Sequence, residues 1–193
     1  MNRKLARFIS RVGHPVFLLA AFLSYTLFSI HQLEKAILTV FGVILIGILP
    51  LVVWNFVHTK MVVYSNFDVS IRLERYSMYG FIAVLSLLVM VFLLLTDQPF
   101  NVLLGCLLII ELVMLAFLIN FRLKISLHVA MSIYVAFGLL SMNRPLAWLL
   151  LVAVPLIAWS RWQLGRHRVS ELVGGVLLGL FCGMQLLYFN GQE

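Results

Sequence analysis

The amino-acid sequence predicts an all-α fold, a polytopic transmembrane helical bundle of six to seven spans that forms a single integral membrane domain over residues 1–193. The first observation is composition: 63% of the residues are hydrophobic and only 11% are charged, which is too apolar for a soluble domain of this size. The second is that the apolar residues gather in seven runs. The third is that these runs are apolar on all sides, whereas the strands of a membrane barrel alternate apolar and polar residues.

The seven runs are the predicted spans. They cover residues 15–30, 36–57, 77–96, 100–120, 126–142, 145–159 and 171–189. A helix needs about 20 residues to cross the ~30 Å hydrocarbon core, so the first and sixth runs are short. The connections at 31–35, 97–99 and 143–144 predict tight hairpins, with Pro99 and Pro145 placed where a new helix can begin.

The basic residues are distributed unevenly between the two sides that seven crossings define. The N-terminus and the loops near 58–76, 121–125 and 160–170 carry 12 of the 14 Lys and Arg residues, and only Lys35 and Arg144 are opposite. The positive-inside rule therefore predicts a cytoplasmic basic side and a C-terminus outside, in a cell (inner) membrane. In a membrane protein the net charge of +7 reflects this distribution and predicts no nucleic-acid partner.

Two features of the chain have simple interpretations. Residues 1–11 carry four basic side chains, precede further spans and lack a small-residue cleavage site, so they predict a basic anchor at the membrane surface and no removable signal peptide. Cys106 and Cys182 both fall inside apolar runs, where they are interpreted as small core residues and not as a disulfide or metal pair.

The residues best suited to chemistry all lie on the basic side, in three loops that each precede a span. They are Arg72 and Arg75, then Lys124, Ser126 and His128, then Ser160, Arg161, His167 and Glu171. His167 and Glu171 are four residues apart, so they share a helix face if the last helix begins near Arg168. The carboxylate can then fix one imidazole tautomer, as a nucleophile or general base requires. Arginines offer guanidinium forks that match phosphoryl oxygens.

This arrangement resembles the type 2 phosphatidic acid phosphatase superfamily, membrane lipid phosphatases with a histidine nucleophile and three motifs in this order. The family's third motif is Ser-Arg, five residues, His, three residues and Asp. Ser160-Arg161, His167 and Glu171 meet it with only the last acid changed. The second motif, Pro-Ser-Gly-His, is met in part by Ile125-Ser126-Leu127-His128, which keeps the serine and the histidine.

The first motif, a Lys followed seven residues later by Arg-Pro, is the least similar. Arg75 takes the arginine position, but Tyr76 follows it and Asp68 stands at the lysine position. Arg72 or Lys124 can replace the lost charge. The resemblance covers roughly residues 58–189, the predicted phosphatase-like core. Two spans between successive motifs return all three to one face of the membrane.

The resemblance implies a lipid phosphatase that hydrolyses a phosphate monoester or diphosphate, as in phosphatidic acid or an isoprenyl diphosphate, with no metal or other cofactor. It implies that His167 attacks phosphorus to give a phosphohistidine, that Glu171 orients it, and that His128 is the acid and later the base. The implied ligands of the phosphoryl oxygens are Arg161, Arg75, Ser126, Lys124 and Arg72. The implied partners are a lipid phosphate substrate and membrane lipids.

Two other functions stay open. One is a lipid phosphotransferase that passes the phosphoryl group to an alcohol. The other is a non-catalytic lipid-binding or transport protein, in which Glu111, near the middle of its span, belongs to a proton or ion path. A structural role for Glu111 is the simpler interpretation. His14, His31 and His58 are interpreted as bystanders. Gly174, Gly175, Gly179 and Gly183 predict close packing of the last helix.

Overall fold

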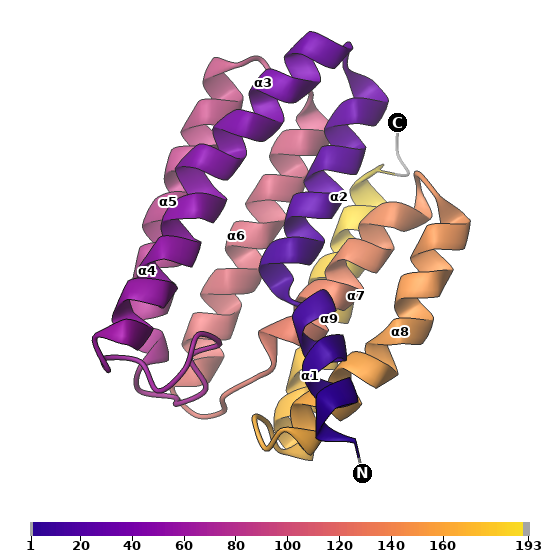
Figure 1. The fold of residues 1–193 in the computed structure, drawn as a ribbon. Coiled ribbons are helices and arrows are strands. Elements are labelled where there is room, and N and C mark those ends of the chain that lie inside the picture. Colours follow the sequence, from indigo (N-terminus) through magenta and orange to yellow (C-terminus); the bar gives the residue numbers. More distant parts are fainter. Residues whose placement is uncertain (1, 191–193) are drawn as a thin grey trace. The chain divides into compact units, whose positions relative to one another are not determined.

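The computed structural model describes residues 2–190, and every regular element in that range is a helix (Figure 1). The elements are α1 Arg3–Val12, α2 Pro15–Ile30, α3 Leu33–Val43, the π-helical turn η1 Ile44–Ile48, α4 Leu49–Lys60, α5 Arg75–Leu95, α6 Phe100–Asn120, α7 Leu127–Leu140, α8 Arg144–Gln163 and α9 Val169–Asn190. Within the described residues, six stretches are long and apolar enough to cross a membrane, and α7 is a shorter apolar helix. The predicted all-α polytopic fold is confirmed.

Three predicted spans differ from the structure as described next, and the spans predicted at 77–96 and 171–189 differ by one or two residues at each end. The span predicted at 145–159 is too short, because α8 continues to Gln163 and places Ser160 and Arg161 in a helix, not a loop. An apolar run stops at its first charged residue, but a helix continues when a long basic side chain finds polar surroundings. The stretch predicted at 36–57 extends over 33–60. The span predicted at 126–142 is too long, because α7 has only 14 residues.

The described chain divides into two compact units. Unit 1 contains the described residues up to Phe22 and from Phe121 onward, and unit 2 contains Leu23–Asn120. The second and third motifs therefore belong to unit 1. The residues of the first motif belong to unit 2.

Unit 2 has an apolar core built by α2, α3, α5 and α6. Its buried residues are Leu27, Val43, Leu93 and Val102. At one end, His31 Nε2 lies 2.8 Å from Gln98 Oε1 in a hydrogen bond that joins two hairpins. His58 stacks on Trp54, with ring centroids 4.0 Å apart. Both histidines thus have structural contacts within unit 2. Glu111 is partly buried in α6.

Unit 1 is organised around α7. Eleven of the 14 residues of this helix are buried, and it packs against both α8 and α9. The apolar core contains Val129, Ile133, Val154 and Leu172. The predicted close packing of the last helix is confirmed, because a Cβ at Gly179 would stand 2.6 Å from Ala130 O and one at Gly183 would stand 2.9 Å from the Phe137 ring. Glycine lets α9 approach the α7 backbone directly.

Candidate functional site

A Schellman turn ends α8, at the start of the connection between α8 and α9. Gly165 has a φ of +67°, a left-handed conformation that glycine adopts at low cost. Its N–H donates to Trp162 O at 2.9 Å, and the N–H of Arg166 donates to Arg161 O at 3.0 Å, the hydrogen-bond pair that defines this motif. The N–H of His167 donates to the same Arg161 carbonyl at 3.3 Å. A fixed turn therefore sets the spacing between Arg161 and His167.

His167 and Glu171 form the hydrogen bond that their spacing predicts. His167 Nδ1 lies 2.9 Å from Glu171 Oε2, and α9 begins at Val169, close to the expected start. The same carboxylate oxygen accepts the N–H of Arg168 at 3.2 Å, as a glutamate in the third helical position does in a capping box. Because a carboxylate only accepts, His167 Nδ1 carries a proton, and the neutral ring has its lone pair on Nε2. The His167 side chain is 1% exposed.

Lys124 and Ser126 bring the segment before α7 against this pair. Lys124 Nζ donates to Arg166 O at 2.9 Å and lies 3.6 Å from Glu171 Oε2. Ser126 N–H donates to Glu171 O at 3.0 Å. A Cβ at Gly175 would stand 2.7 Å from Ser126 O, so only glycine allows this approach. The start of α7 lies against the first turns of α9, and the second and third motifs meet in one place.

The side chain of Ser126 is buried at the start of α7. Ser126 occupies the N-cap position of α7, but its side chain makes no capping hydrogen bond. Its Oγ is buried and has no hydrogen-bond partner among residues 2–190. The first N–H groups of a helix lack intrahelical acceptors, and together with the helix dipole they favour an anion. A buried hydroxyl beside these groups can donate to an anionic oxygen.

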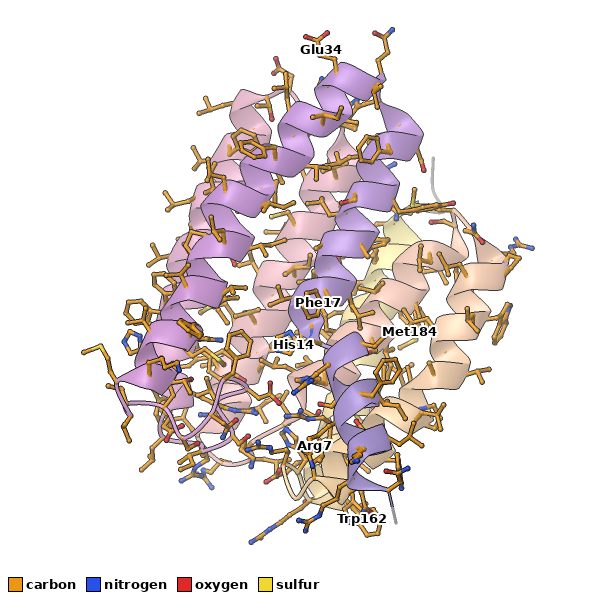
Figure 2. The ribbon with its side chains drawn as sticks, in the orientation of Figure 1. Arg7, His14, Phe17, Glu34, Trp162 and Met184 are labelled. Atoms are coloured by element: carbon orange, nitrogen blue, oxygen red, sulfur yellow. The ribbon has the colours of Figure 1, made fainter. Side chains whose placement is uncertain are left out.

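His128 lies in the first turn of α7 and is 5% exposed. Its ring meets the ring of His14 edge to face, with centroids 5.0 Å apart and an interplanar angle of 84°. Figure 2 shows His14 at the junction of α1 and α2, where its Nδ1 accepts the N–H of Val16 at 3.3 Å. The structure thus places a histidine that was interpreted as a bystander against a candidate catalytic residue.

Arg161 stands in the last turn of α8 and is fully buried. Its Nη1 donates to Ser10 Oγ at 2.6 Å, and Ser10 is itself 5% exposed on α1. A guanidinium keeps its charge at any ordinary pH, so its burial requires polar or anionic surroundings. Arg161 therefore holds a fixed positive charge on the turn that carries His167.

Arg72 and Arg75 belong to unit 2, where the structure shows a local role for each. Arg75 is the first residue of α5 and is 3% exposed, and its Nε donates to Val69 O at 2.9 Å. Asn120 Nδ2 donates to Arg72 O at 3.1 Å. These contacts hold the loop between α4 and α5 against the ends of α5 and α6. The predicted phosphate contacts of both arginines stay a prediction.

Ser10 and His14 lie beside candidate site residues, and sequence reasoning did not assign them to the site. Part of the signal was present, because Gly13 and Pro15 flank His14, and glycine after a helix and proline at the start of the next mark a helix break. The packing of α1 against α8 is a tertiary contact. No spacing within the sequence reveals it.

Comparisons with protein-family models, with curated proteins and with solved structures find no match for this chain. The fold and the site define its class on their own. The protein is a polytopic α-helical membrane protein. One end of its unit 1 carries a hydrogen-bonded pair of a buried histidine and a partly buried glutamate, a helix start with no side-chain cap, and a buried arginine.

Proposed function

We propose that this protein is a membrane lipid phosphatase with the histidine chemistry of the type 2 phosphatidic acid phosphatase superfamily. The observation that carries the proposal is the His167–Glu171 hydrogen bond of 2.9 Å, made directly against the start of α7. A histidine held by a carboxylate through Nδ1 presents its Nε2 lone pair as a nucleophile. The neighbouring polar groups then bind the phosphoryl group.

In the first step, His167 Nε2 attacks phosphorus and forms a P–N bond. The P–O bond to the lipid breaks, and His128 gives a proton to the departing oxygen. Glu171 accepts the His167 Nδ1–H throughout and stabilises the positive charge that develops on the ring. Lys124 lies 3.6 Å from the same carboxylate and fixes its position.

In the second step, water attacks the phosphohistidine. His128, now neutral, takes a proton from the water, the P–N bond breaks, and phosphate leaves while His167 regains its lone pair. Lys124 and Arg161 balance the negative charge of the phosphoryl oxygens in both steps, and Ser126 donates a hydrogen bond to one of these oxygens, since phosphoryl transfer depends mainly on positioning and charge stabilisation.

A lipid is the proposed substrate because the candidate residues lie at the ends of membrane-spanning helices, at the level of lipid headgroups. A lipid anchored in the bilayer can present its phosphate there while its chains stay in hydrocarbon. The substrate class is a phosphate monoester or a diphosphate, and the reaction needs no cofactor. The basic side is proposed to be cytoplasmic, in a cell (inner) membrane, which a reporter fused to the C-terminus tests. The account expects that reporter outside the cytoplasm.

The proposal is tested by phosphate release from purified protein in detergent, with excess chelator present. The substrates are phosphatidic acid, phosphatidylglycerol phosphate and an isoprenyl diphosphate. Wild type is expected to release phosphate from at least one of them, and His167→Ala is expected to release none. The matched control is His31→Ala, which removes a histidine that contacts Gln98 in unit 2 and should leave turnover unchanged.

Each outcome of this experiment bears on the function. Equal turnover by wild type and His167→Ala would contradict the proposed nucleophile. Loss of substrate without phosphate release, with the group recovered on an added alcohol, would indicate a phosphotransferase. No reaction with any substrate would favour a non-catalytic lipid-binding or transport protein.

A further inference from the structure

The exposed surface of α1 is a second feature of unit 1 that points to a ligand. We propose that α1 is an interfacial helix that binds anionic lipid headgroups, at a surface distinct from the candidate catalytic site. This proposal rests on which residues of α1 face the protein and which do not. It is independent of the proposed phosphatase activity.

Small residues fix the rotation of α1 about its axis. Ala6 is fully buried and Ser10 is 5% exposed. Ser10 Oγ accepts a hydrogen bond of 2.6 Å from Arg161 in α8. A Cβ added at Gly13 would stand 2.8 Å from the side chain of Ile157, also in α8. The face formed by these small residues is therefore the packing face, and α1 cannot turn without losing the buried hydrogen bond.

The other two faces of α1 are exposed and differ in chemistry. With 3.6 residues per turn, Leu5, Phe8 and Val12 fall on one arc, and they are 48%, 65% and 59% exposed. The four basic residues fall on another arc, and all are exposed: Arg3, Lys4, Arg7 and Arg11. Each of the three faces takes roughly a third of the circumference. The helix has one side for the protein, one for hydrocarbon and one for anions.

This division suits a helix that lies in the membrane interface. Such helices bury their apolar arc at the boundary of headgroups and acyl chains and direct Lys and Arg toward anionic lipids. No acidic residue occurs in α1 to compensate its four positive charges. The helix leads through Gly13 and His14 into α2, so its place at the end of a membrane span keeps the basic arc at headgroup level. Figure 2 shows Arg7 on α1 in unit 1.

The charge complementarity selects the ligand class. An anionic headgroup such as that of phosphatidylglycerol carries a phosphodiester charge, whereas phosphatidylcholine is zwitterionic. Each basic residue near an anionic surface strengthens binding by about fivefold at most. The expected enrichment of phosphatidylglycerol over phosphatidylcholine beside α1 is about threefold or more, since salt and headgroup exchange reduce the full effect.

The test uses full-length protein in lipid nanodiscs. In a Cys106→Ala/Cys182→Ala background, Phe8→Cys carries a fluorophore on the apolar arc. Its quenching is compared between discs in which only phosphatidylglycerol is brominated, near the top of the acyl chain, and discs in which only phosphatidylcholine is brominated. The fraction of each brominated lipid is the same. The proposal expects stronger quenching by brominated phosphatidylglycerol.

Charge variants supply the control. Arg7→Gln/Arg11→Gln should remove most of the preference for phosphatidylglycerol, whereas Lys35→Gln/Arg144→Gln, which also removes two positive charges, should keep it. Equal quenching by the two lipids in the unmodified charge background would overturn headgroup recognition. An absence of quenching by either lipid would show that something other than the bilayer covers the apolar arc. Neither readout depends on turnover, so this test and that of the phosphatase can fail separately.

Discussion

Replacing Gly179 by alanine tests the close approach of α9 to α7. The added Cβ would stand 2.6 Å from Ala130 O and 2.9 Å from Ile133 Cβ. Ordinary contacts begin near 3.4 Å, so the two helices must separate by about 0.8 Å, because a carbonyl oxygen in a helix cannot rotate away. Overpacking of this kind typically costs about 1–3 kcal/mol. A protein of this size loses about 2–4 °C in Tm for each kcal/mol, which gives a fall of roughly 2–12 °C.

The assay is thermal unfolding in detergent at a fixed scan rate, followed by intrinsic fluorescence. The matched control is Gly80→Ala in α5, where a new Cβ meets no atom within 4 Å among the described residues. Removing a glycine from a helix interior stabilises the folded state by about 0.5–1 kcal/mol when there is space. Gly80→Ala should therefore leave the Tm unchanged or raise it. If the two variants behave alike, the reasoning about helix packing in unit 1 is refuted.

Three further predictions concern the candidate site. Glu171→Gln should lower kcat by about 100-fold or more, because the amide can hold His167 in the wrong tautomer; unchanged kcat would exclude Glu171 from catalysis. Gly165→Ala should lower stability by about 1 kcal/mol, since its φ is +67° and no clash is added, and turnover should fall with it; an unchanged Tm would contradict the Schellman turn. Ser10→Ala should raise KM, because Arg161 loses its 2.6 Å hydrogen bond. Ser10→Thr keeps a hydroxyl and should return KM to the wild-type value. A KM that does not change in Ser10→Ala would exclude Ser10 as a positioning residue.

Much of the fold could be predicted from composition and run length. Each apolar run corresponds to a helical stretch, because in a bilayer the backbone N–H and C=O groups must form their hydrogen bonds within the segment. The run at 36–57 contains α3, η1 and α4 in succession. The ends of the helices were harder to predict from the sequence. α8 continues to Gln163 because the Arg161 side chain is hydrogen-bonded to Ser10. These two residues are 151 positions apart in the sequence. The π-helical turn at Ile44–Ile48 lies before Pro50, whose missing N–H disturbs the regular hydrogen-bond ladder.

The candidate site, too, could be predicted only in part. The hydrogen bond between His167 and Glu171 could be predicted, because four residues make one turn of a helix and no distant element is needed. The spacing from Arg161 to His167 now has a physical basis in the turn at Gly165. The contact between His14 and His128 could not be predicted. It depends on how α1 and α2 meet the start of α7.

Trapping the phosphoenzyme tests the central claim most directly. Protein is incubated with a phosphate-labelled lipid substrate, quenched with denaturant at alkaline pH and digested, and the phosphopeptides are identified by mass spectrometry. The account predicts an acid-labile, alkali-stable phosphoryl group on His167 in the wild-type protein, and no phosphoryl group in His167→Ala. Turnover that proceeds with no phosphoryl group on His167, or with the group on another residue, would contradict it.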